Sequence, residues 1–431
     1  MRISLLALSA AAMLAQNFDI ALIGDMPYGP AAEPKFERVI ADINRQVVDF
    51  TIHIGDTKSG STRCDNSHYT KVVSWFNSFD TGVIYTPGDN EWADCLRTNN
   101  GAYDPLDRLA LIRKTYYQTN QSLGRRPVTV TRQSEDPKYA LYAENAILVK
   151  GPVVFGTIHA IGSNNNLEYK LVQGVANKFY DNDKEFAARN EANVAWLRKI
   201  FATAKQNKSL GILIGLQANI FETFLDTGTG STRSGFEEFV KVLRTETLAF
   251  PGEVVLVSGD SHYMRVDKPL TSLFPACTSA TGDCKPFDAA LDARGDRVIN
   301  FTRLEVSGSA DVHWTLCHVR PNSRNLFQFE FMIVADRPAG AAVTAAINGP
   351  SVIETNSPQV ALDASGSTTP NTGDLTYSWS VPQGYPQAAI LNGGTATPTV
   401  QMSTRGLHQF TVTVTDRTGA TSSATVTVRY I

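Results

Sequence analysis

The chain has 431 residues, with 39 Lys and Arg against 42 Asp and Glu, which gives a formal net charge of −3. This balance lacks the bulk positive field that holds nucleic acid or an anionic membrane surface. Hydrophobic residues make up 42% and charged residues 19%. Such a composition supports a sizeable core and excludes global disorder, and the length indicates two domains.

Residues 1–15 have the pattern of a secretory signal peptide. Arg2 precedes an apolar run over residues 3–14, and Ala15 provides a small residue at the exit. The run is too short to span a bilayer, and no later segment approaches a membrane span. A buried first helix is the alternative, but the run has no polar face. We therefore expect a secreted protein, extracellular or periplasmic and soluble.

Residues 16–336 alternate short apolar strands with amphipathic helices. The predicted strands are too short and too rich in β-branched residues for buried helices, and they cover residues 18–23, 48–54, 82–85, 153–161, 211–216, 254–258 and 301–306. The predicted helices cover residues 34–46, 69–79, 105–117, 184–204 and 235–248. This alternation indicates a layered α/β domain, in which chemistry lies in loops beyond the carboxyl ends of strands.

Four aspartates each follow a glycine at the end of a predicted strand: Asp25, Asp56, Asp89 and Asp260, with His262 two residues after the last. Glycine allows the backbone to turn sharply and to aim the next side chain over the sheet edge. One isolated Gly-Asp pair commonly marks only a turn. Four carboxylates at one edge would repel each other without a cation among them, so the pattern predicts a metal cluster.

The order of these motifs resembles that of the calcineurin-like metallophosphoesterases, a superfamily that includes the purple acid phosphatases. That family has Asp-x-His, Gly-Asp, Gly-Asn-His-Asp/Glu, a lone His after a strand, and Gly-His-x-His. The counterparts here are Asp25-Met26-Pro27, Gly55-Asp56, Gly88-Asp89-Asn90-Glu91, Gln217 and Gly259-Asp260-Ser261-His262. The resemblance implies two facing mixed β-sheets flanked by helices.

The same resemblance implies two divalent ions bridged by Asp56. Asp25 and His262 would complete the first site, where Pro27 replaces the family's His and Tyr28 is a candidate substitute.

Asp89, Gln217 and Asp260 would complete the second site, which then offers oxygen ligands throughout. Such a site favours hard cations such as manganese, magnesium or calcium over zinc, with iron as a further candidate for the pair.

Two such ions would activate a water for in-line attack on a phosphate mono- or diester. Lys58 and the amides of Asn164 and Asn165 are the candidate phosphate contacts, although each could equally be a solvated loop residue. The family's leaving-group acid is replaced by Asn90, whose amide cannot act as a general acid. His313 could take over that role if the chain folds back to the site.

The replaced histidines also support a rival hypothesis of another class. In it, the chain is a catalytically weak or inactive relative that uses its scaffold for binding or adhesion, with a structural cation. A Ser-His-Asp hydrolase is not indicated because no Gly-x-Ser-x-Gly element follows a strand. A phosphate loop of the Gly-x-x-x-x-Gly-Lys-Ser/Thr kind is also missing from the sequence.

Five cysteines fit an exported protein if four of them are paired. We expect a disulfide between Cys64 and Cys95, which would join two loops of one pocket rim, and another between Cys277 and Cys284, around a short polar loop. Cys317 lies in an apolar stretch and is expected to be a small core residue.

The composition changes at residues 337–344, which have the character of a linker. Residues 345–431 are rich in Thr, Ser, Val, Gly and Pro, and segments such as 411–415 alternate polar and apolar residues. This pattern predicts strands with one buried face and hence a small β-sandwich.

Within this sandwich, residues 362–367, 377–379 and 406–416 resemble the polycystic-kidney-disease (PKD) immunoglobulin-like repeat. The resemblance implies that Trp379 is a core residue, and we expect His408 to face solvent. Binding to a polysaccharide or a cell surface is an expectation by analogy.

Overall fold

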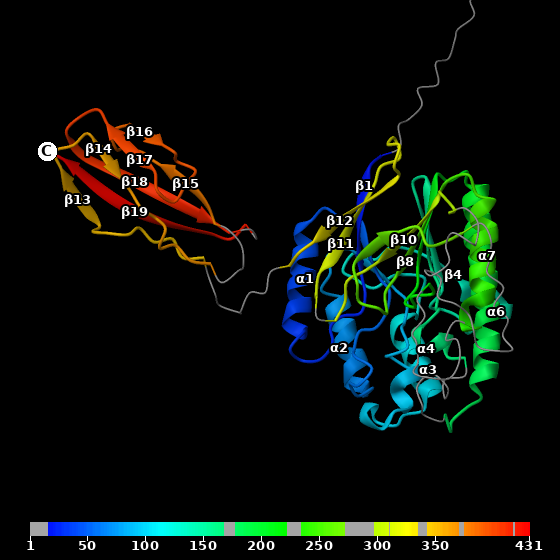
Figure 1. Ribbon diagram of the computed structural model, residues 1–431. Helices are drawn as coiled ribbons and strands as arrows, with labels where there is room; N and C mark the ends of the chain where they lie inside the picture. The colour runs from blue at the N-terminus through cyan, green and yellow to red at the C-terminus, as the bar shows by residue number, and fades with distance from the viewer. Residues whose placement is uncertain are drawn as a thin grey trace, which may run out of the picture. The chain divides into compact units, whose positions relative to one another are not determined.

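The structure is a computed structural model that describes residues 16–167, 177–221, 234–271, 297–309, 311–334, 343–369, 375–416 and 419–431. The chain divides into two compact units, Met1–Ile333 and Val334–Ile431. Figure 1 shows an α/β body for the first unit and a β-sandwich for the second. The expected mixed α/β class with a C-terminal sandwich is therefore confirmed.

One mixed sheet of the first unit has the strand order β12-β11-β1-β2-β3. Its strands are β1 (Phe18–Ile23), β2 (Phe50–His53), β3 (Gly82–Tyr85), β11 (Trp314–Val319) and β12 (Phe327–Met332). The strands β1, β2 and β3 are parallel to one another, whereas β11 pairs antiparallel with β1. The carboxyl ends of the three parallel strands therefore share one edge.

The second sheet has the order β4-β5-β6-β7-β8-β10-β9. Its strands are β4 (Thr131–Arg132), β5 (Ala146–Lys150), β6 (Val153–Thr157), β7 (Gly211–Gly215), β8 (Glu253–Ser258), β9 (Arg265–Asp267) and β10 (Phe301–Glu305). Strands β6, β7, β8 and β10 are parallel, so their carboxyl ends also meet at one edge.

The longer helices are α1 (Glu33–Arg45), α2 (Asn66–Phe76), α3 (Pro105–Tyr116), α6 (Asn182–Gln206) and α7 (Glu237–Leu248), and α4 (Gly162–Asn165) is a single short turn. Helix α1 buries Phe36, Val39, Ile40 and Ile43, the spacing of one apolar helix face. Helix α3 begins where the Asp104 side chain accepts the Leu106 N–H at 2.9 Å, which satisfies an otherwise unpaired donor.

A hydrophobic core between the two sheets shows that they face each other. It joins residues of the first sheet, such as Ile20 and Ile52, to residues of the second, such as Leu213 and Val255. A second core joins the outer face of the seven-stranded sheet to α6 and α7, which lie along that face in Figure 1. The acidic loops lie at the edges of these facing layers.

The C-terminal unit consists of two small sheets. One has the order β13-β19-β18-β15 and the other the order β14-β17-β16. Their bounds are β13 (Val352–Thr355), β14 (Gln359–Ala361), β15 (Thr376–Ser380), β16 (Ala388–Leu391), β17 (Thr399–Met402), β18 (Gly406–Thr415) and β19 (Thr421–Tyr430). Trp379 is only 7% exposed and packs in the core with Phe410 and Val412, which confirms the prediction for this residue.

The expectation for His408 is wrong. In β18 the alternation of inward and outward side chains places His408 inside with Phe410 and Val412, and its ring nitrogen Nε2 lies 2.8 Å from the Thr404 carbonyl oxygen. The polar character of histidine suggested a solvent-facing position, but the period of the strand determines the face.

The cysteine predictions have mixed outcomes. Cys64 and Cys95 form a disulfide with a Cα–Cα distance of 5.8 Å, and Cys317 is free and buried, as expected. Cys277 and Cys284 lie outside the described residues, as do the signal segment 1–15 and most of the linker. Among the described helices, none combines the length and apolar character needed to cross a membrane.

Candidate metal centre

The edges of both sheets bring the expected aspartates together. Asp25, Asp56 and Asp89 follow β1, β2 and β3, and Asp260 follows β8. One carboxylate oxygen from each of Asp56, Asp89 and Asp260 lies within 4.8 Å of the other two. Asp25 joins this cluster because its two carboxylate oxygens accept the Asp260 backbone N–H at 3.0 and 3.1 Å. Residues more than 200 positions apart in sequence therefore meet at one place.

Close backbone packing allows the carboxylates to converge. A Cβ atom on Gly88 would lie 2.0 Å from Oδ1 of Asp56, and one on Gly259 would lie 2.0 Å from Oδ2 of Asp25. Both positions therefore exclude any side chain. The glycines before Asp89 and Asp260 thus make room for a carboxylate that follows another strand.

Backbone strain is concentrated at this cluster. Asp25, Asp56, Asp260 and His262 have positive φ values of 51°, 57°, 72° and 64°. Residues 163–166 add four more, so that eight of the twelve non-glycine residues with positive φ in the described chain belong to these loops. The left-handed conformation costs an L-residue roughly 1–2 kcal/mol, and such strain is typical of functional sites.

Two amide side chains hold Asp56. Asn90 donates from Nδ2 to Oδ2 of Asp56 at 2.7 Å and from its backbone N–H to Oδ1 at 3.2 Å. Gln217 donates from Nε2 to Asp56 at 3.2 Å and to Asp260 at 3.1 Å. Its Oε1 accepts the Gly162 N–H at 2.6 Å, which fixes the orientation of the amide. Gln217 therefore lies in the cluster but presents N–H groups, rather than the expected oxygen ligand, to the carboxylates.

Tyr28 and His262 also lie beside Asp56. The Tyr28 hydroxyl donates to Oδ2 of Asp56 at 2.9 Å and lies 3.3 Å from Nε2 of His262. The same His262 nitrogen lies 3.7 Å from Oδ1 of Asp25. Two groups of side chains therefore lie around Asp56. One contains Asp25, Tyr28 and His262, and the other contains Asp89 and Asp260.

Burial and mutual repulsion both act on the carboxylates of the cluster. Burial raises the pKa of Asp25, Asp56 and Asp260 well above the ordinary value, and neighbouring carboxylates, chiefly Asp260 for the first and Asp89 for the other two, raise it further. Two charges 4.8 Å apart repel by about 3.5 kcal/mol at an effective dielectric constant of 20. A cation among the carboxylates would favour their ionised forms.

Lys58 is buried among several carboxylates. Its side chain is only 1% exposed, and Nζ donates to the Ser59 carbonyl at 2.9 Å. Burial lowers the pKa of Lys58, while the carboxylates of Glu91, Asp94 and Asp56 raise it. A buried ammonium group among these acids offsets their charge, and a contact between Lys58 and a substrate phosphate stays a prediction.

The amides of Asn164 and Asn165 are used within the protein. Both residues are buried, and both bind Gly235: Oδ1 of Asn164 accepts the Gly235 N–H at 3.0 Å, and Nδ2 of Asn165 donates to the Gly235 carbonyl at 3.1 Å. A contact between these residues and a substrate phosphate stays a prediction. The two side chains hold the left-handed turn 163–166 against its neighbour.

Ser163, the first residue of that turn, is the one that faces the cluster. Its hydroxyl donates to Oδ2 of Asp89 at 2.6 Å. The turn is fixed from behind by the fully buried Arg189, which donates to the Asn165 side chain at 2.6 Å and to its carbonyl at 2.9 Å. The sequence signal for Ser163 was its place just after a strand, but nothing in the sequence distinguished its hydroxyl from the neighbouring amides.

His313 precedes β11 and packs edge-on against Phe331 of β12, with ring centroids 5.4 Å apart. This contact places it at the edge of the five-stranded sheet, and its role as a proton donor stays a prediction. The disulfide, by contrast, lies as expected: Cys64 and Cys95 link the loops that follow Asp56 and Asp89.

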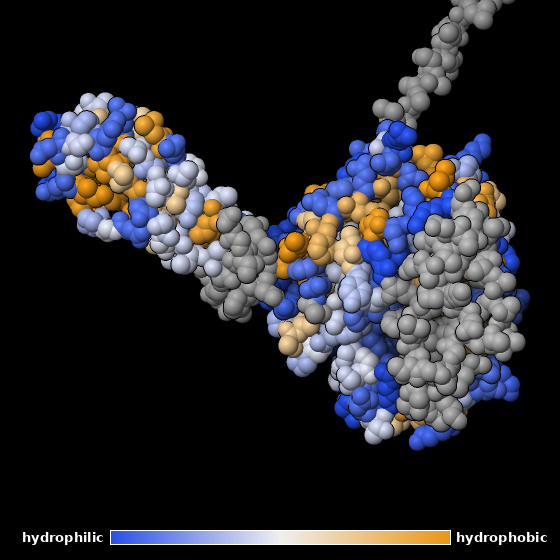
Figure 2. Space-filling model, viewed as in Figure 1, coloured by the Kyte–Doolittle hydropathy of each residue, from blue (hydrophilic) through white to orange (hydrophobic). Residues whose placement is uncertain are grey.

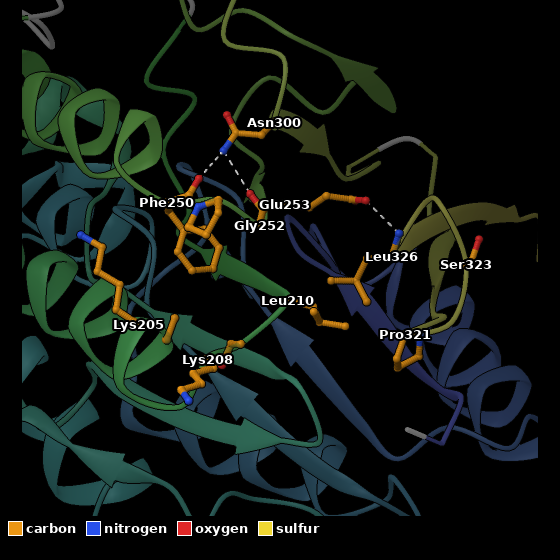
Figure 3. A pocket seen from close by; sticks show the side chains of 13 residues that line it. Lys205, Lys208, Leu210, Phe250, Gly252, Glu253, Asn300, Pro321, Ser323 and Leu326 are labelled. Carbon is orange, nitrogen blue, oxygen red and sulfur yellow. Dashed lines mark hydrogen bonds between the residues drawn. The ribbon is translucent and has the colours of Figure 1, made fainter. Parts of the chain in front are cut away.

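A pocket of about 650 Å³ lies at the other end of the strands (Figure 3). Leu210 and Glu253, at the amino ends of β7 and β8, belong to its lining. Figure 3 shows Asn300 directed at the carbonyls of Phe250 and Gly252, to which it donates at 2.9 and 3.0 Å. The sequence-predicted site residues do not line this pocket, so the candidate site remains the carboxylate cluster.

Comparison with known proteins identifies one part of the chain. A family model described as a PKD domain matches residues 350–429. The PKD domain of the KIAA 1837 protein is 24% identical, over 22% of this chain and 90% of that chain, with a TM-score of 0.18. The PKD domain of human KIAA0319 is 26% identical, over 21% of this chain and 80% of that chain, with a TM-score of 0.16.

One further structure aligns with most of the chain. A nucleoside hydrolase-related hypothetical protein from Saccharophagus degradans is 13% identical over 96% of this chain and 100% of that chain, with a TM-score of 0.19. A similarity this low carries no inference about fold or function. Comparison with curated proteins found no match. The family match and the observed sandwich together identify the C-terminal unit as a PKD domain.

Proposed function

We propose that residues 16–336 form a metal-dependent phosphoesterase of the calcineurin-like metallophosphoesterase type, which hydrolyses a phosphate mono- or diester. The observation that carries this proposal is the convergence of Asp25, Asp89, Asp260 and His262 around Asp56 at the carboxyl edges of two facing sheets. The order of the motifs along the chain supports the same family.

The residues of the cluster fit hard divalent cations. The site consists mainly of carboxylate oxygens, with one imidazole and one phenol, a set that suits manganese, magnesium, calcium or iron. Ions held there would supply a Lewis acid for the phosphoryl oxygens and would lower the pKa of a bound water. Asp56 would contact both ions, Asp25 and His262 would hold one, and Asp89 and Asp260 would hold the other.

The chain's own residues fix the geometry of this site. Asn90 and Gln217 orient the Asp56 carboxylate by donating to it, and the hydroxyl of Ser163 orients Asp89. The His262 side chain is 31% exposed and Tyr28 is partly exposed, whereas Asp25 is fully buried. Substrate would therefore approach from the side of Tyr28 and His262.

The replacement of the family's acid by Asn90 predicts the kind of substrate. The Asn90 amide donates to Asp56 and to the Tyr28 hydroxyl, at 2.7 and 3.0 Å, and its N–H groups are too weakly acidic to protonate a leaving group. Esters whose leaving group is stable as an anion, such as aryl phosphates or phosphoanhydrides, need no proton donor. We therefore expect activity to fall steeply as the pKa of the leaving group rises.

The test is hydrolysis of p-nitrophenyl phosphate and bis-p-nitrophenyl phosphate by metal-depleted protein with added manganese, magnesium or calcium. We expect turnover that depends on metal and is lost in Asp56→Asn, whereas Asp80→Asn, at an exposed ion pair with Arg125, retains it. Absence of turnover with every metal, or turnover unchanged in Asp56→Asn, would refute the proposal.

A second candidate is a binding protein with a structural cation. It is favoured by the amides of Asn90 and Gln217, which donate hydrogen bonds to Asp56 at positions where the resemblance implies histidines. It predicts that a chelator lowers the melting temperature while no phosphate ester is cleaved. The same hydrolysis assay, combined with a melting curve, distinguishes the two.

For the PKD domain we propose binding to an uncharged polysaccharide or a cell surface. Its larger sheet carries a three-by-three array of hydroxyl side chains, in the rows Ser380-Thr411-Thr425, Ser378-Thr413-Ser423 and Thr376-Thr415-Thr421. Figure 2 shows hydrophobic residues on the visible face of this unit. Val352 and Leu407 are exposed apolar residues of this domain. Co-sedimentation with insoluble polysaccharides, with Thr413→Lys as the disrupted variant, tests this surface.

We also propose that the protein is exported, because residues 1–15 have the signal pattern and the Cys64–Cys95 disulfide fits an oxidising compartment. Mass spectrometry of the protein from its native source would detect the cleaved N-terminus. An N-terminus that retains Met1 would contradict export by this route.

A further inference from the structure

A buried polar network lies directly behind the loop that carries Asp260 and His262. Asn219, which is 3% exposed, donates from Nδ2 to the Ser261 hydroxyl at 2.8 Å and to Oε2 of Glu305 at 3.0 Å. Asn219 follows β7 and Glu305 ends β10. One amide group thus connects the loop after β8 with the strands on either side of it.

Two arginines extend this network. Arg265 lies 3.1 Å from Oε2 of Glu305, and Arg303 donates to Oδ1 of Asn219 at 3.2 Å. Arg303 also binds Asp267 at 2.8 and 2.5 Å through two nitrogens. Both ends of the Asn219 amide are therefore bonded, whereas Oε1 of Glu305 is buried without a hydrogen-bond partner. Bonds at both ends fix the orientation of the amide.

The contact point of the network is the residue between the two expected ligands. Ser261 separates Asp260 and His262, which have φ values of 72° and 64°. A relaxed loop would leave this left-handed conformation, because it is unfavourable for residues other than glycine. A bond to the Ser261 hydroxyl restrains both neighbours at once. It does so without contacting Asp25 or Asp56.

We propose that Asn219 is a positioning residue, which holds Asp260 and His262 in their strained conformations so that both side chains face Asp56. The inference rests on the proposed function in one respect, namely that these side chains are metal ligands. Residues that orient metal ligands from behind typically change metal affinity about 10- to 100-fold when mutated. The network itself can be tested whether or not the protein is an enzyme.

The test compares Asn219→Ala with Asn300→Ala in the full chain. Asn300 is a matched control because its amide also joins loops of the same sheet, through the carbonyls of Thr247, Phe250 and Gly252, but at the opposite strand ends. The first measurement is hydrogen exchange of metal-free protein over residues 258–263. The backbone N–H groups of Gly259, Asp260 and Ser261 are all hydrogen-bonded there and should be protected. The second is Mn²⁺ affinity by titration calorimetry.

We expect Asn219→Ala to increase exchange over residues 258–263 and to weaken Mn²⁺ binding by about 10-fold or more. Asn300→Ala should lower thermal stability without either effect. Should Asn219→Ala not fold, Ser261→Ala removes a single hydroxyl and should show the same two changes, and Ser261→Thr should restore them.

Exchange unchanged in Asn219→Ala overturns the inference. Loss of stability alone, equal in the two asparagine variants, also overturns it. If wild-type protein binds no metal, the proposed function fails while the exchange result still decides the positioning role.

Discussion

Removing metal from the carboxylate cluster should destabilise the first unit, and more so at higher pH. Each pair among Asp56, Asp89 and Asp260 lies within 4.8 Å, so ionising two of them without a cation introduces about 3.5 kcal/mol of repulsion at an effective dielectric constant of 20. The protein can avoid this penalty by binding protons. Burial and the neighbouring charges favour the protonated carboxyl groups and so raise the pKa of Asp56 and Asp260.

The sign of the pH effect follows from these raised pKa values. Above the unfolded-state pKa of about 4, the folded protein binds more protons than the unfolded chain, so the free energy of unfolding falls as pH rises. The decline continues until the folded-state pKa is passed. A bound divalent ion replaces the protons and removes the decline. A free metal concentration of 100 times Kd adds about 2.7 kcal/mol, or about 4 °C in Tm for a unit of this size.

Differential scanning calorimetry between pH 5 and pH 8 measures both effects, with chelator and with excess Mn²⁺. In metal-free protein, Asp56→Asn should raise Tm at pH 8 and flatten its pH dependence, and it should abolish the Mn²⁺ shift. Asp80→Asn, at an exposed ion pair, should change neither. The electrostatic reasoning would be refuted if the Tm of the metal-free wild-type protein did not fall more than that of Asp56→Asn between pH 5 and pH 8. It would also be refuted if Mn²⁺ raised the Tm of both proteins equally.

Three further changes test other parts of the structure. Lys208 follows α6 and has a φ of 51°, in the turn where the N–H of Ser209 donates to the Ala204 carbonyl. Lys208→Gly should therefore raise the free energy of unfolding, measured by urea denaturation, by about 0.5–1 kcal/mol, whereas Lys208→Ala should give no gain. Replacing Cys64 and Cys95 by serine opens a loop with a sequence separation of 31 and should remove about 3–4 kcal/mol, and a reductant should lower the wild-type urea midpoint to the same value. Trp379→Ala should lower the free energy of unfolding of the sandwich by about 3–5 kcal/mol. Hydrogen exchange should then show lost protection in residues 399–415 and unchanged protection in residues 16–167. An equal loss in both segments would contradict the assignment of Trp379 to the core of the sandwich.

Much of the fold was readable because strand and helix periods are local properties. The predicted strand at residues 18–23 coincides with β1, and the predicted helix at residues 105–117 with α3 (Pro105–Tyr116). Strand β12 was missed although Phe327–Met332 alternates phenylalanine with polar residues. Edge strands of this kind have one exposed face, and their alternation is easily taken for a loop.

The sequence predicted where the backbone of the site lies but not how its side chains are oriented. Each glycine before an aspartate showed where a strand ends, and parallel strands bring such ends together. The orientation of Gln217 depends on Gly162, which is 55 residues away, and the burial of Lys58 depends on acids from other loops. Lysine is usually exposed, so composition alone favoured the wrong environment. Such details require the tertiary neighbours.

The most direct measurement is a crystal structure of the protein grown with Mn²⁺, with diffraction data recorded at the manganese absorption edge. The proposed centre predicts anomalous peaks in contact with Asp56, one bounded by Asp89 and Asp260 and one by Asp25 and His262. Data that show ordered aspartates at these positions and no anomalous peak among them would contradict the central claim.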